Sequence, residues 1–421
     1  MSVTALLKRP NEEYAVFLLL PRPTRVLLIT NMIYAFVLPV IEIFVGAYIM
    51  RSSNDPSIVA VYQLTVYTGI PITFCINGFL LNRIKISHLY SFGMLLSGLS
   101  MIVMMSLENL SVAGVAVAGL LMGCSFGFFW ANRDFLALNT TNDSTRNYYY
   151  GLETFFYTIT YIIVPVVVGS FLATTEAGGW LNGNVNMAYR IVTVVVFILT
   201  ILSSIVIHRE QFKNPEQKEF LFFKFHSLWK KMMALAGLKG LAQGYLVTAP
   251  AILIMRLVGN EGSLGLVQGI SGIATAFMLY VLGRTTKPSD RIYIFSVGLF
   301  IFLVGTLFNG ILFSAIGVMV FVLCKVLFAP LHDIAYFPTE MRVIDVVSRI
   351  EKRSEFAYIF NHEFGLYVGR FLGLGLFIGL ATYVSEIFAL KYALIIIAVI
   401  QLASIPVAKH IIKEANKLST L

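Results

Sequence analysis

Acidic and basic side chains lie inside the long apolar segments of this 421-residue chain. Glu42 lies in the first such segment, and Lys325 and Arg370 fall near the middle of two later ones. A charge in apolar surroundings is costly unless a partner or water reaches it. A carboxylate there takes up protons more readily, and a buried cation attracts anionic ligands. These residues therefore indicate ligand binding and proton exchange as the chemistry of the chain.

A polar stretch between two apolar segments has a counterpart later in the chain. Residues 130–134 (WANRD) correspond to residues 329–333 (APLHD), and residues 153–157 (ETFFY) correspond to residues 363–367 (EFGLY). In both places an acid near the end of one apolar segment is followed by an acid near the start of the next. This pattern predicts a duplicated membrane half with ionisable groups at corresponding places.

The composition is that of a polytopic membrane protein. Hydrophobic residues make up 58% of the chain and charged residues only 13%, whereas soluble domains carry about 25% charged residues. The mean hydropathy is +0.81. The net charge of +9 lies mostly in loops of one side, so it does not predict a nucleic-acid partner. Three cysteines in apolar segments indicate neither a disulfide framework nor a zinc site.

The elements that must position these residues are membrane-spanning helices, each of which needs about 20 largely apolar residues. The predicted helices span residues 25–50, 56–81, 87–107, 110–138, 146–174, 187–207, 232–258, 262–283, 291–312, 314–338, 355–383 and 386–408. We therefore predict an all-α membrane protein with twelve transmembrane helices in two six-helix, pseudo-symmetric halves. The predicted parts are an N-terminal tail (1–24), a first half (25–207), a central loop (208–231), a second half (232–408) and a C-terminal tail (409–421).

Basic residues predict the orientation of these helices, because cytoplasmic loops carry an excess of lysine and arginine. The tails, the central loop and the loops on the same side hold most of them. They include Arg83, Lys85, Arg146, Lys213, Lys218, Lys230, Lys231, Arg284, Lys287, Arg342, Arg349, Lys352, Arg353, Lys409 and Lys413. Both termini are therefore predicted to be cytoplasmic. The compact loops favour a multi-pass protein of the bacterial inner (plasma) membrane.

The two halves share short sequence matches in one register. Residues 49–51 (IMR) recur as residues 254–256, Gln63 recurs as Gln268, and Gly78 recurs as Gly283 at the same offset. These matches predict a parallel repeat of two six-helix halves. Chance similarity between apolar segments is the alternative.

The plan of two six-helix halves with a basic central loop resembles the major facilitator superfamily. That family usually has Gly-x-x-x-Asp-Arg between its second and third helices. Here Gly78 and Arg83 match, while Asn82 replaces the acid. The family's Gly-Pro antiporter signature in the fifth helix is reduced to Pro165 and Gly169. The resemblance implies a secondary transporter that works by alternating access, and not an enzyme.

The resemblance also implies that the first, fourth, seventh and tenth helices line a central cavity, with the fifth, eighth and eleventh beside them. Asn31 and Tyr34 lie on the same stripe of the first helix as Glu42. The predicted substrate-binding residues are Asn31, Tyr34, Lys239, Gln243, Lys325 and Arg370. The cations among them would attract an anionic substrate. The alternative is internal neutralisation, for example of Arg370 by Glu363 on the same helical stripe.

Carboxylates near the cavity and at the helix ends are predicted to couple transport to protons. The predicted proton-coupling residues are Glu42, Glu153 and Glu363. For Glu42 the alternative is a carboxylate that is hydrogen-bonded to a neighbouring helix or hydrated near the outer surface. A cytoplasmic gate is expected from salt bridges of Arg133 and Asp134 with Glu153, and of His332 and Asp333 with Glu363. Anchoring of the helix ends near lipid headgroups is the alternative. No metal site is predicted, although His332, Asp333, His362 and Glu363 have the chemistry of metal ligands.

We therefore predict a proton-coupled symporter or antiporter of a small polar or anionic organic solute, without cofactors, acting as a monomer in the lipid bilayer. A proton-coupled exporter of hydrophobic drugs or lipids is the alternative, which Glu42 and the aromatic run Phe126, Phe128, Phe129 and Trp130 favour. An integral-membrane enzyme or a nonconducting sensor is less favoured, because no catalytic group of residues stands out in the loops.

Overall fold

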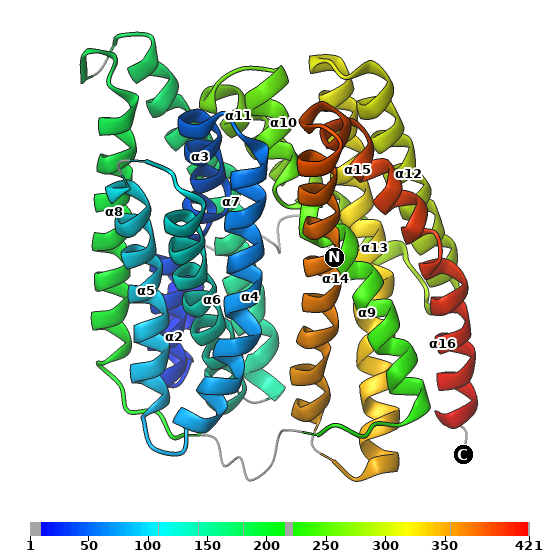
Figure 1. Cartoon of the computed structure of the whole chain (residues 1–421). Helices are drawn as coiled ribbons and strands as arrows, with labels where there is room; N and C mark the ends of the chain where they lie inside the picture. The colour runs from blue at the N-terminus through cyan, green and yellow to red at the C-terminus, as the bar shows by residue number, and fades with distance from the viewer. Residues whose placement is uncertain are drawn as a thin grey trace.

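The computed structural model describes residues 10–107, 109–141, 143–179, 181–214, 222–353 and 355–419. In these residues the chain forms two helical bundles that lie side by side (Figure 1). Twelve helical segments are long and apolar enough to cross a membrane, among the residues described. The prediction of an all-α protein with twelve membrane-spanning helices is confirmed.

The first bundle, here called the N half, runs from α2 to α8. A short helix, α1 (Pro10–Leu19), precedes it. The helices of the N half are α2 (Arg22–Ala35), η2 (Val40–Phe44), α3 (Val45–Ser53), α4 (Pro56–Leu80), α5 (Ile86–Ser106), α6 (Val112–Thr140), α7 (Asp143–Glu176), η3 (Leu181–Gly183) and α8 (Val185–Ile207). Together α2, η2 and α3 form one membrane span.

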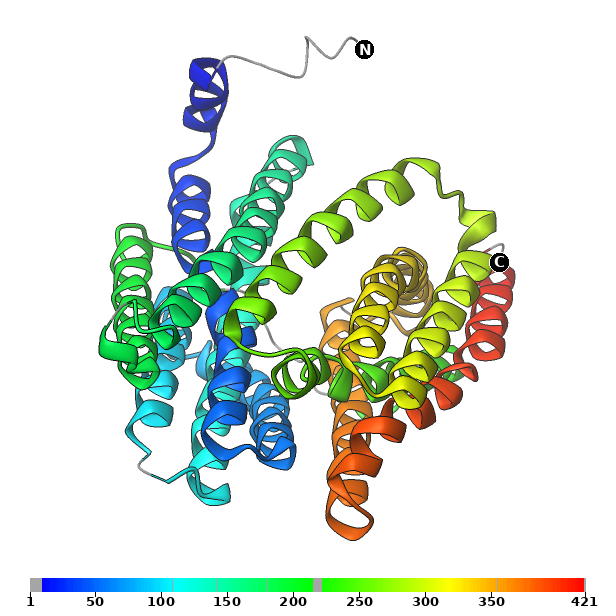
Figure 2. The same ribbon diagram turned by 90° about the horizontal axis from the view of Figure 1, so that it is seen from above.

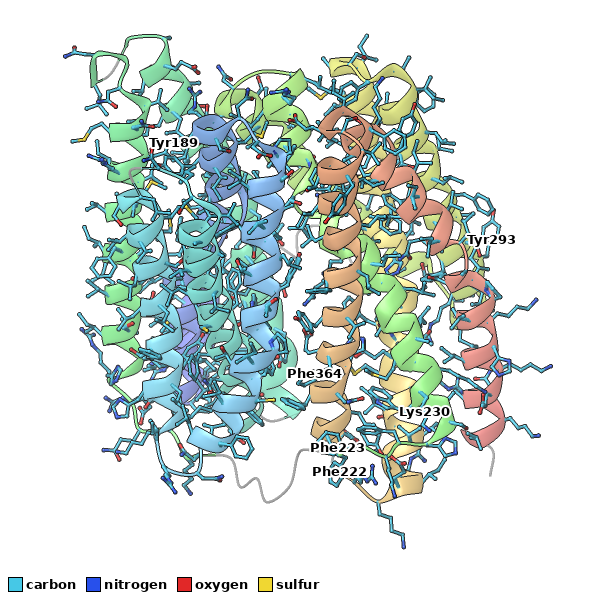
Figure 3. The ribbon with its side chains drawn as sticks, viewed as in Figure 1. Tyr189, Phe222, Phe223, Lys230, Tyr293 and Phe364 are labelled. Atoms are coloured by element: carbon cyan, nitrogen blue, oxygen red, sulfur yellow. The ribbon has the colours of Figure 1, made fainter. Side chains whose placement is uncertain are left out.

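The second bundle, the C half, follows the linker between α8 and α9. Its helices are α9 (Ser227–Leu246), α10 (Ala249–Leu257), α11 (Glu261–Thr285), η4 (Pro288–Asp290), α12 (Arg291–Leu312), α13 (Ala315–Glu351), α14 (Glu355–Tyr383), α15 (Glu386–Gln401) and α16 (Ser404–Ser419). The end of the bundles that carries the linker and α16 is called the linker side below. Phe222, Phe223 and Lys230 mark it in Figure 3, and Tyr189 lies toward the opposite side.

The first span of each half is interrupted midway, and a proline accounts for each interruption. A proline within a helix clashes with the carbonyl four residues earlier and cannot donate to it. Pro39 lies four residues after Ala35, where α2 ends, and Pro250 lies four residues after Leu246, where α9 ends. The chain then continues through the π-helical turn η2 in the N half and through α10 in the C half. Glu42 lies on η2.

The tenth span is much longer than predicted. We predicted a helix over 314–338 and a loop over 340–355, but α13 continues to Glu351. Pro330 and Pro338 both lie inside α13 and do not end it. The reason is tertiary packing, because Val343, Ile344 and Val347 beyond the second proline are buried at 0–2% exposure. The expected loop is therefore helical over most of its length.

The most extensive contacts between the halves are those of α7 with α11 and of α4 with α14, and α3 also meets α10. Viewed from above, these helices lie along the boundary between the bundles (Figure 2). At the α7–α11 crossing, a Cβ added to Gly265 would lie 2.1 Å from the backbone oxygen of Pro165 and 3.1 Å from the Cα of Gly169. Gly169, which remains of the Gly-Pro signature together with Pro165, and Gly265 therefore allow close contact between the halves.

Candidate functional site

A cavity of about 460 Å³ lies between the halves and is called the central cavity. Its lining includes four charged residues, Glu42 and Asp134 from the N half and Glu363 and Arg370 from the C half. The aromatic residues that line it are Tyr62, Tyr67, Phe74, Phe126 and Trp130. The polar amides are Gln63 and Gln243. The cavity thus combines an apolar wall with a few charged groups, as ligand-binding sites generally do.

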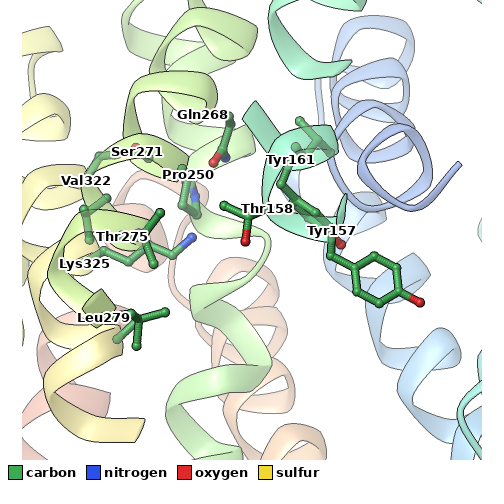
Figure 4. Close-up of a pocket in the computed structure, with 15 residues that line it drawn as sticks. Tyr157, Thr158, Tyr161, Pro250, Gln268, Ser271, Thr275, Leu279, Val322 and Lys325 are labelled. Carbon is green, nitrogen blue, oxygen red and sulfur yellow. The ribbon is translucent and has the colours of Figure 1, made fainter. Parts of the chain in front are cut away.

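A second cavity of about 320 Å³ lies between α7 of the N half and α11 and α13 of the C half, and is called the lysine cavity. Lys325 is the one charged residue among its lining residues. Figure 4 shows the ammonium group of Lys325 pointing from α13 across the cavity toward Thr158 of α7. The other polar lining residues include Gln268, Ser271 and Thr275. Lys325, which was predicted to bind substrate, therefore faces a cavity.

Tyr161 of α7 lines one cavity and contacts a residue of the other. Its hydroxyl group donates a 2.5 Å hydrogen bond to Oε2 of Glu42, which lines the central cavity. Tyr161 itself lines the lysine cavity. Glu42 and Lys325 also interact electrostatically across this region. The π-helical turn η2 thus presents an acid to the boundary between the halves, as π-helical turns at functional sites often do.

Arg370 and Gln243, both predicted substrate ligands, lie together in the wall of the central cavity. The Nε and one terminal nitrogen of Arg370 donate to Oε1 of Gln243 at 3.1 and 2.9 Å. Another terminal nitrogen donates to Glu363 at 3.4 Å. The guanidinium also lies 4.8 Å from the ring centroid of Tyr67. The guanidinium is thus held by the protein itself, partly by the internal neutralisation that was the alternative to substrate binding.

Lys239 is held by other groups of the C half. Its ammonium donates to Oδ1 of Asp333 at 3.0 Å. It also lies 4.1 Å from the ring centroid of Tyr336 and 3.8 Å from that of Phe337. Lys239 does not line either of the two cavities. Its geometry therefore favours neutralisation within the C half over substrate binding.

Asn31 belongs to a buried network in the N half. Its amide nitrogen donates to Oε1 of Glu153 at 2.6 Å and to the Tyr149 hydroxyl at 3.1 Å, while Tyr90 donates to its oxygen. Arg133 donates to both carboxylate oxygens of Glu153. The Glu153 side chain is only 1% exposed. This network places Asn31 and Glu153 in the interior of the N half, outside the two cavities.

Tyr34 is also fully buried, with its ring centroid 4.4 Å from that of Phe129. It does not line either cavity. Tyr34 therefore packs within the N half. A substrate could reach it only after this packing changes.

The two predicted gate clusters form only in part, and each lies within one half. Arg133 joins Glu153 and also donates to Asp134 at 2.7 Å, as the sequence pattern predicted. His332 contacts Asp333 at 3.0 Å, but the cationic partner of Asp333 is Lys239. Glu363 does not join them and contacts Arg370 instead. The expected His332–Asp333–Glu363 cluster is thus replaced by a group of His332, Asp333 and Lys239 and by a separate Glu363–Arg370 pair.

An ion pair and a hydrogen bond that the sequence pattern does not reveal connect the halves on the side away from the linker. Arg51 at the end of α3 donates to both carboxylate oxygens of Glu261 at the start of α11, at 2.5 and 2.6 Å. Arg51 also contacts Glu176 at 3.0 Å. Arg256 at the end of α10 donates to Asn54 of the N half at 2.5 Å. Arg51 and Arg256 are the matching arginines of the IMR repeat, so the repeat marks both arginines but not their partners.

A further buried group lies in the C half around Glu340, where the sequence pattern predicts a loop and the structure has helix α13. Its Oε1 lies 3.1 Å from Nδ1 of His362. Nε2 of His362 lies 2.7 Å from the Tyr336 hydroxyl. Glu340 is 3% exposed, and its Oε2 has no hydrogen-bond partner among the described residues. As for metals, no three histidine, cysteine or acidic side chains group together in the described part of the chain.

Comparison with known proteins shows similarity of fold to solved transporter structures. No protein-family model matches the chain. The uncharacterized protein YqgE of Bacillus subtilis (strain 168) is 21% identical over 381 residues, which cover 87% of this chain and 84% of that protein. The structure of the nucleoside transporter NupG matches with a TM-score of 0.64 and 13% identity, covering 93% of this chain and 100% of that chain.

The POT family transporter PepTSo matches with a TM-score of 0.72 and 9% identity, covering 94% of this chain and 99% of that chain. The chain has the fold of the major facilitator superfamily. The resemblance that the sequence predicted is thereby confirmed at the level of the fold. At these identities the likeness concerns the fold alone, and function has to be argued from the cavities.

Proposed function

We propose that this protein is a secondary transporter that moves a small polar or anionic organic solute across a membrane by alternating access. The observation that carries the proposal is the pair of cavities between the halves, which hold Glu42, Arg370 and Lys325 within membrane-spanning segments. Charged residues are rare at such places unless they serve a ligand or an ion. The proposed role is transport, because these residues form no catalytic group with a nucleophile.

The arrangement of the helices supports alternating access. Interrupted helices beside a cavity between repeated halves are typical of transporters in which the halves rock around a fixed site. Here the first span of each half is interrupted near a cavity, at Pro39 and at Pro250. Glu42 on η2 and Pro250 on α10 line these cavities. The Arg51–Glu261 pair joins the halves on the side away from the linker. In the proposed cycle this pair breaks when the solute is exposed to that side.

Proton coupling is proposed to use Glu42 first, with Glu363 next. Glu42 lines the central cavity and accepts a hydrogen bond from Tyr161, so a proton can reach it from the cavity. Glu363 lines the same cavity and contacts Arg370 at 3.4 Å. Glu153 is already bound to Arg133, Asn31 and Tyr149. Its proposed contribution is to hold α2, α6 and α7 together.

The proposed location is the bacterial inner membrane, with both termini in the cytoplasm and the protein acting as a monomer. The support is the concentration of basic residues in the tails and linker, which cytoplasmic loops generally show. In this orientation the Arg51–Glu261 pair closes the periplasmic side.

The test is solute flux into liposomes that contain the purified protein and an interior pH dye. The panel contains organic anions, amino acids, sugars, nucleosides and cationic drugs. We expect uptake of one class together with proton movement, which Glu42→Gln abolishes. Asp345→Asn, which changes an exposed acid outside both cavities, should leave both signals intact. Absence of flux with every class, from protein that is folded by its thermal unfolding transition, would contradict the proposal.

A proton-coupled exporter of hydrophobic drugs or lipids is the second candidate. The observation that favours it is the aromatic wall of the central cavity, to which Tyr67, Phe74, Phe126 and Trp130 contribute. The same flux experiment separates the candidates. Proton movement that depends on cationic drugs, and that Glu42→Gln abolishes while Arg370→Ala preserves it, would favour the exporter.

A further inference from the structure

Most charges that line the central cavity are already matched within the protein. Arg370 is bound by Gln243 and contacts Glu363. Asp134 accepts a hydrogen bond from Arg133 at 2.7 Å. Glu42 is different, because the hydrogen bond that it accepts from the described residues comes from Tyr161, a neutral donor. Glu42 is therefore the acid of this cavity without a cationic hydrogen-bond partner in the described part of the chain.

Lys325 is the corresponding unpaired cation among the described residues, and it lies in the lysine cavity, which Tyr161 also lines. Its ammonium makes no hydrogen bond or ion pair with a described residue, although it lies in a membrane-spanning helix. The hydroxyl groups of Thr158, Ser271 and Thr275 and the amide of Gln268 line the same cavity. An unpaired cation surrounded by neutral hydrogen-bonding groups suits a carboxylate, which takes charge-assisted bonds from the ammonium and further bonds from hydroxyl groups.

The acid and the cation come from different halves and interact electrostatically with each other. Glu42 belongs to the N half, and Lys325 to the C half. Two opposite charges at one boundary do not suit a ligand of single charge, which would satisfy one group and leave the other unmatched. A ligand with both charges would match both groups, and it would connect the two halves.

We propose that the solute is a zwitterion, whose protonated amine binds Glu42 in place of the Tyr161 hydroxyl and whose carboxylate binds Lys325. This inference rests on the proposed transport function and narrows its substrate class. Cavities of 460 and 320 Å³ are within the usual range for small-molecule sites, about 300–1,000 Å³. The candidate solutes are therefore small zwitterions such as amino acids and dipeptides.

The first test changes the ligand and leaves the protein intact. Thermal stabilisation and calorimetric binding are measured on the purified wild-type protein with L-amino acids and dipeptides. Each zwitterion is compared with its N-acetyl derivative, which lacks the amine charge, and with its carboxamide, which lacks the carboxylate. We expect at least one zwitterion to bind about tenfold or more tightly than both of its derivatives, because each derivative loses one charge-assisted contact.

The second test assigns each charge of that zwitterion to a residue. Glu42→Gln should weaken binding of the zwitterion, so that it binds no more tightly than its N-acetyl derivative. Lys325→Gln should also weaken its binding, so that it binds no more tightly than its carboxamide. Tyr161→Phe should preserve both differences in affinity, because its hydroxyl group is displaced in the bound state. The affinities of both derivatives are measured in each variant. A misfolded variant would bind none of the three compounds, whereas loss of one contact would weaken only the compounds that carry the corresponding charge.

Two results would overturn the zwitterion assignment. One is the failure of every zwitterion to bind. The other is tight binding of a solute with a single charge or none, at an affinity that Lys325→Gln does not change. Flux of such a solute in liposomes would still support the proposed transport function, so the two proposals can fail separately.

Discussion

Arg51 and Glu261 form a two-pronged ion pair between the halves of the molecule. Both carboxylate oxygens of Glu261 accept hydrogen bonds from the Arg51 guanidinium, at 2.5 and 2.6 Å. Glu261 is completely buried and also accepts a 2.9 Å hydrogen bond from the Tyr189 hydroxyl. The pair lies on the side away from the linker, where α3 ends and α11 begins. It therefore stabilises contact between the halves on one side only.

We predict that Glu261→Gln opens this side in a fraction of the molecules. The glutamine keeps the shape of the side chain but removes the charge that holds Arg51. Removing one partner of a buried charged pair typically costs about 2–5 kcal/mol, enough to shift the balance between two conformations. The measurement is the distance between spin labels at Val112 and Ile316, two exposed residues near this side in opposite halves. The native cysteines are replaced by alanine first.

Arg256→Gln is the informative comparison for that experiment. Arg256 is the repeat counterpart of Arg51, but its contact across the halves is with the neutral Asn54. We expect a smaller population with long distances than in Glu261→Gln. Unchanged distances in both variants would show that the ion pair does not hold the halves together.

The second prediction concerns the close crossing of α7 and α11. A methyl group at Gly265 would lie 2.1 Å from the Pro165 carbonyl oxygen, so Gly265→Ala must push the helices apart. We expect a loss of about 1–3 kcal/mol in the free energy of unfolding, as is usual for overpacking, and reduced flux. Gly375→Ala is the matched control, since a methyl group there meets no heavy atom within 4 Å. Equal effects of the two substitutions on the melting temperature would contradict a specific contact at Gly265.

Apolar length and proline position made most of the spans predictable from the sequence. The predicted range 291–312 coincides with α12, and 355–383 coincides with α14. The end of α13 was not predictable, because a proline normally favours the end of a helix. Only the burial of residues such as Val343 and Val347 against other helices explains its continuation.

Partners of ionisable residues were predictable only where the chain itself brings them together. Arg133 and Glu153 lie on consecutive helices and do form a pair. Lys239 pairs with Asp333, which lies on a helix distant in sequence, and no spacing rule indicates that contact. The same holds for Arg51 and Glu261, whose contact depends on how the two halves dock. Sequence therefore located the charged groups, and the tertiary structure decided which of them remain unpaired.

The third prediction tests the role of the Arg133–Glu153 network as a structural element of the N half. Arg133→Met leaves Glu153 buried without its cation, which typically costs about 3–5 kcal/mol. The double variant with Glu153→Gln removes the unpaired charge and should therefore recover much of the lost stability. The measurement is the melting temperature, which should be higher in the double variant than in Arg133→Met. Asp134→Asn is the control, because the Asp134 side chain is 63% exposed and its pair with Arg133 should contribute little. A double variant as unstable as Arg133→Met would contradict this account.

The fourth prediction concerns Glu340 and the helix that continues beyond Pro338. Because α13 extends to Glu351 and packs its apolar face inward, backbone amides of residues 343–351 should exchange slowly with deuterium. Glu340→Ala removes the carboxylate that faces Nδ1 of His362 at 3.1 Å. Leaving a buried polar group without its partner costs about 1–3 kcal/mol, so exchange in this segment should accelerate.

Asp345→Ala provides the matched control for Glu340→Ala, because it changes an exposed acid on the same helix. Its exchange rates should remain close to those of the wild type. If wild-type residues 343–351 exchanged as fast as an unstructured peptide, the extension of α13 would be wrong, and Glu340 would have no fixed place beside His362. If exchange were slow but insensitive to Glu340→Ala, apolar packing alone would stabilise this part of the helix. The Glu340–His362 contact would then contribute nothing measurable to holding α13 against α14.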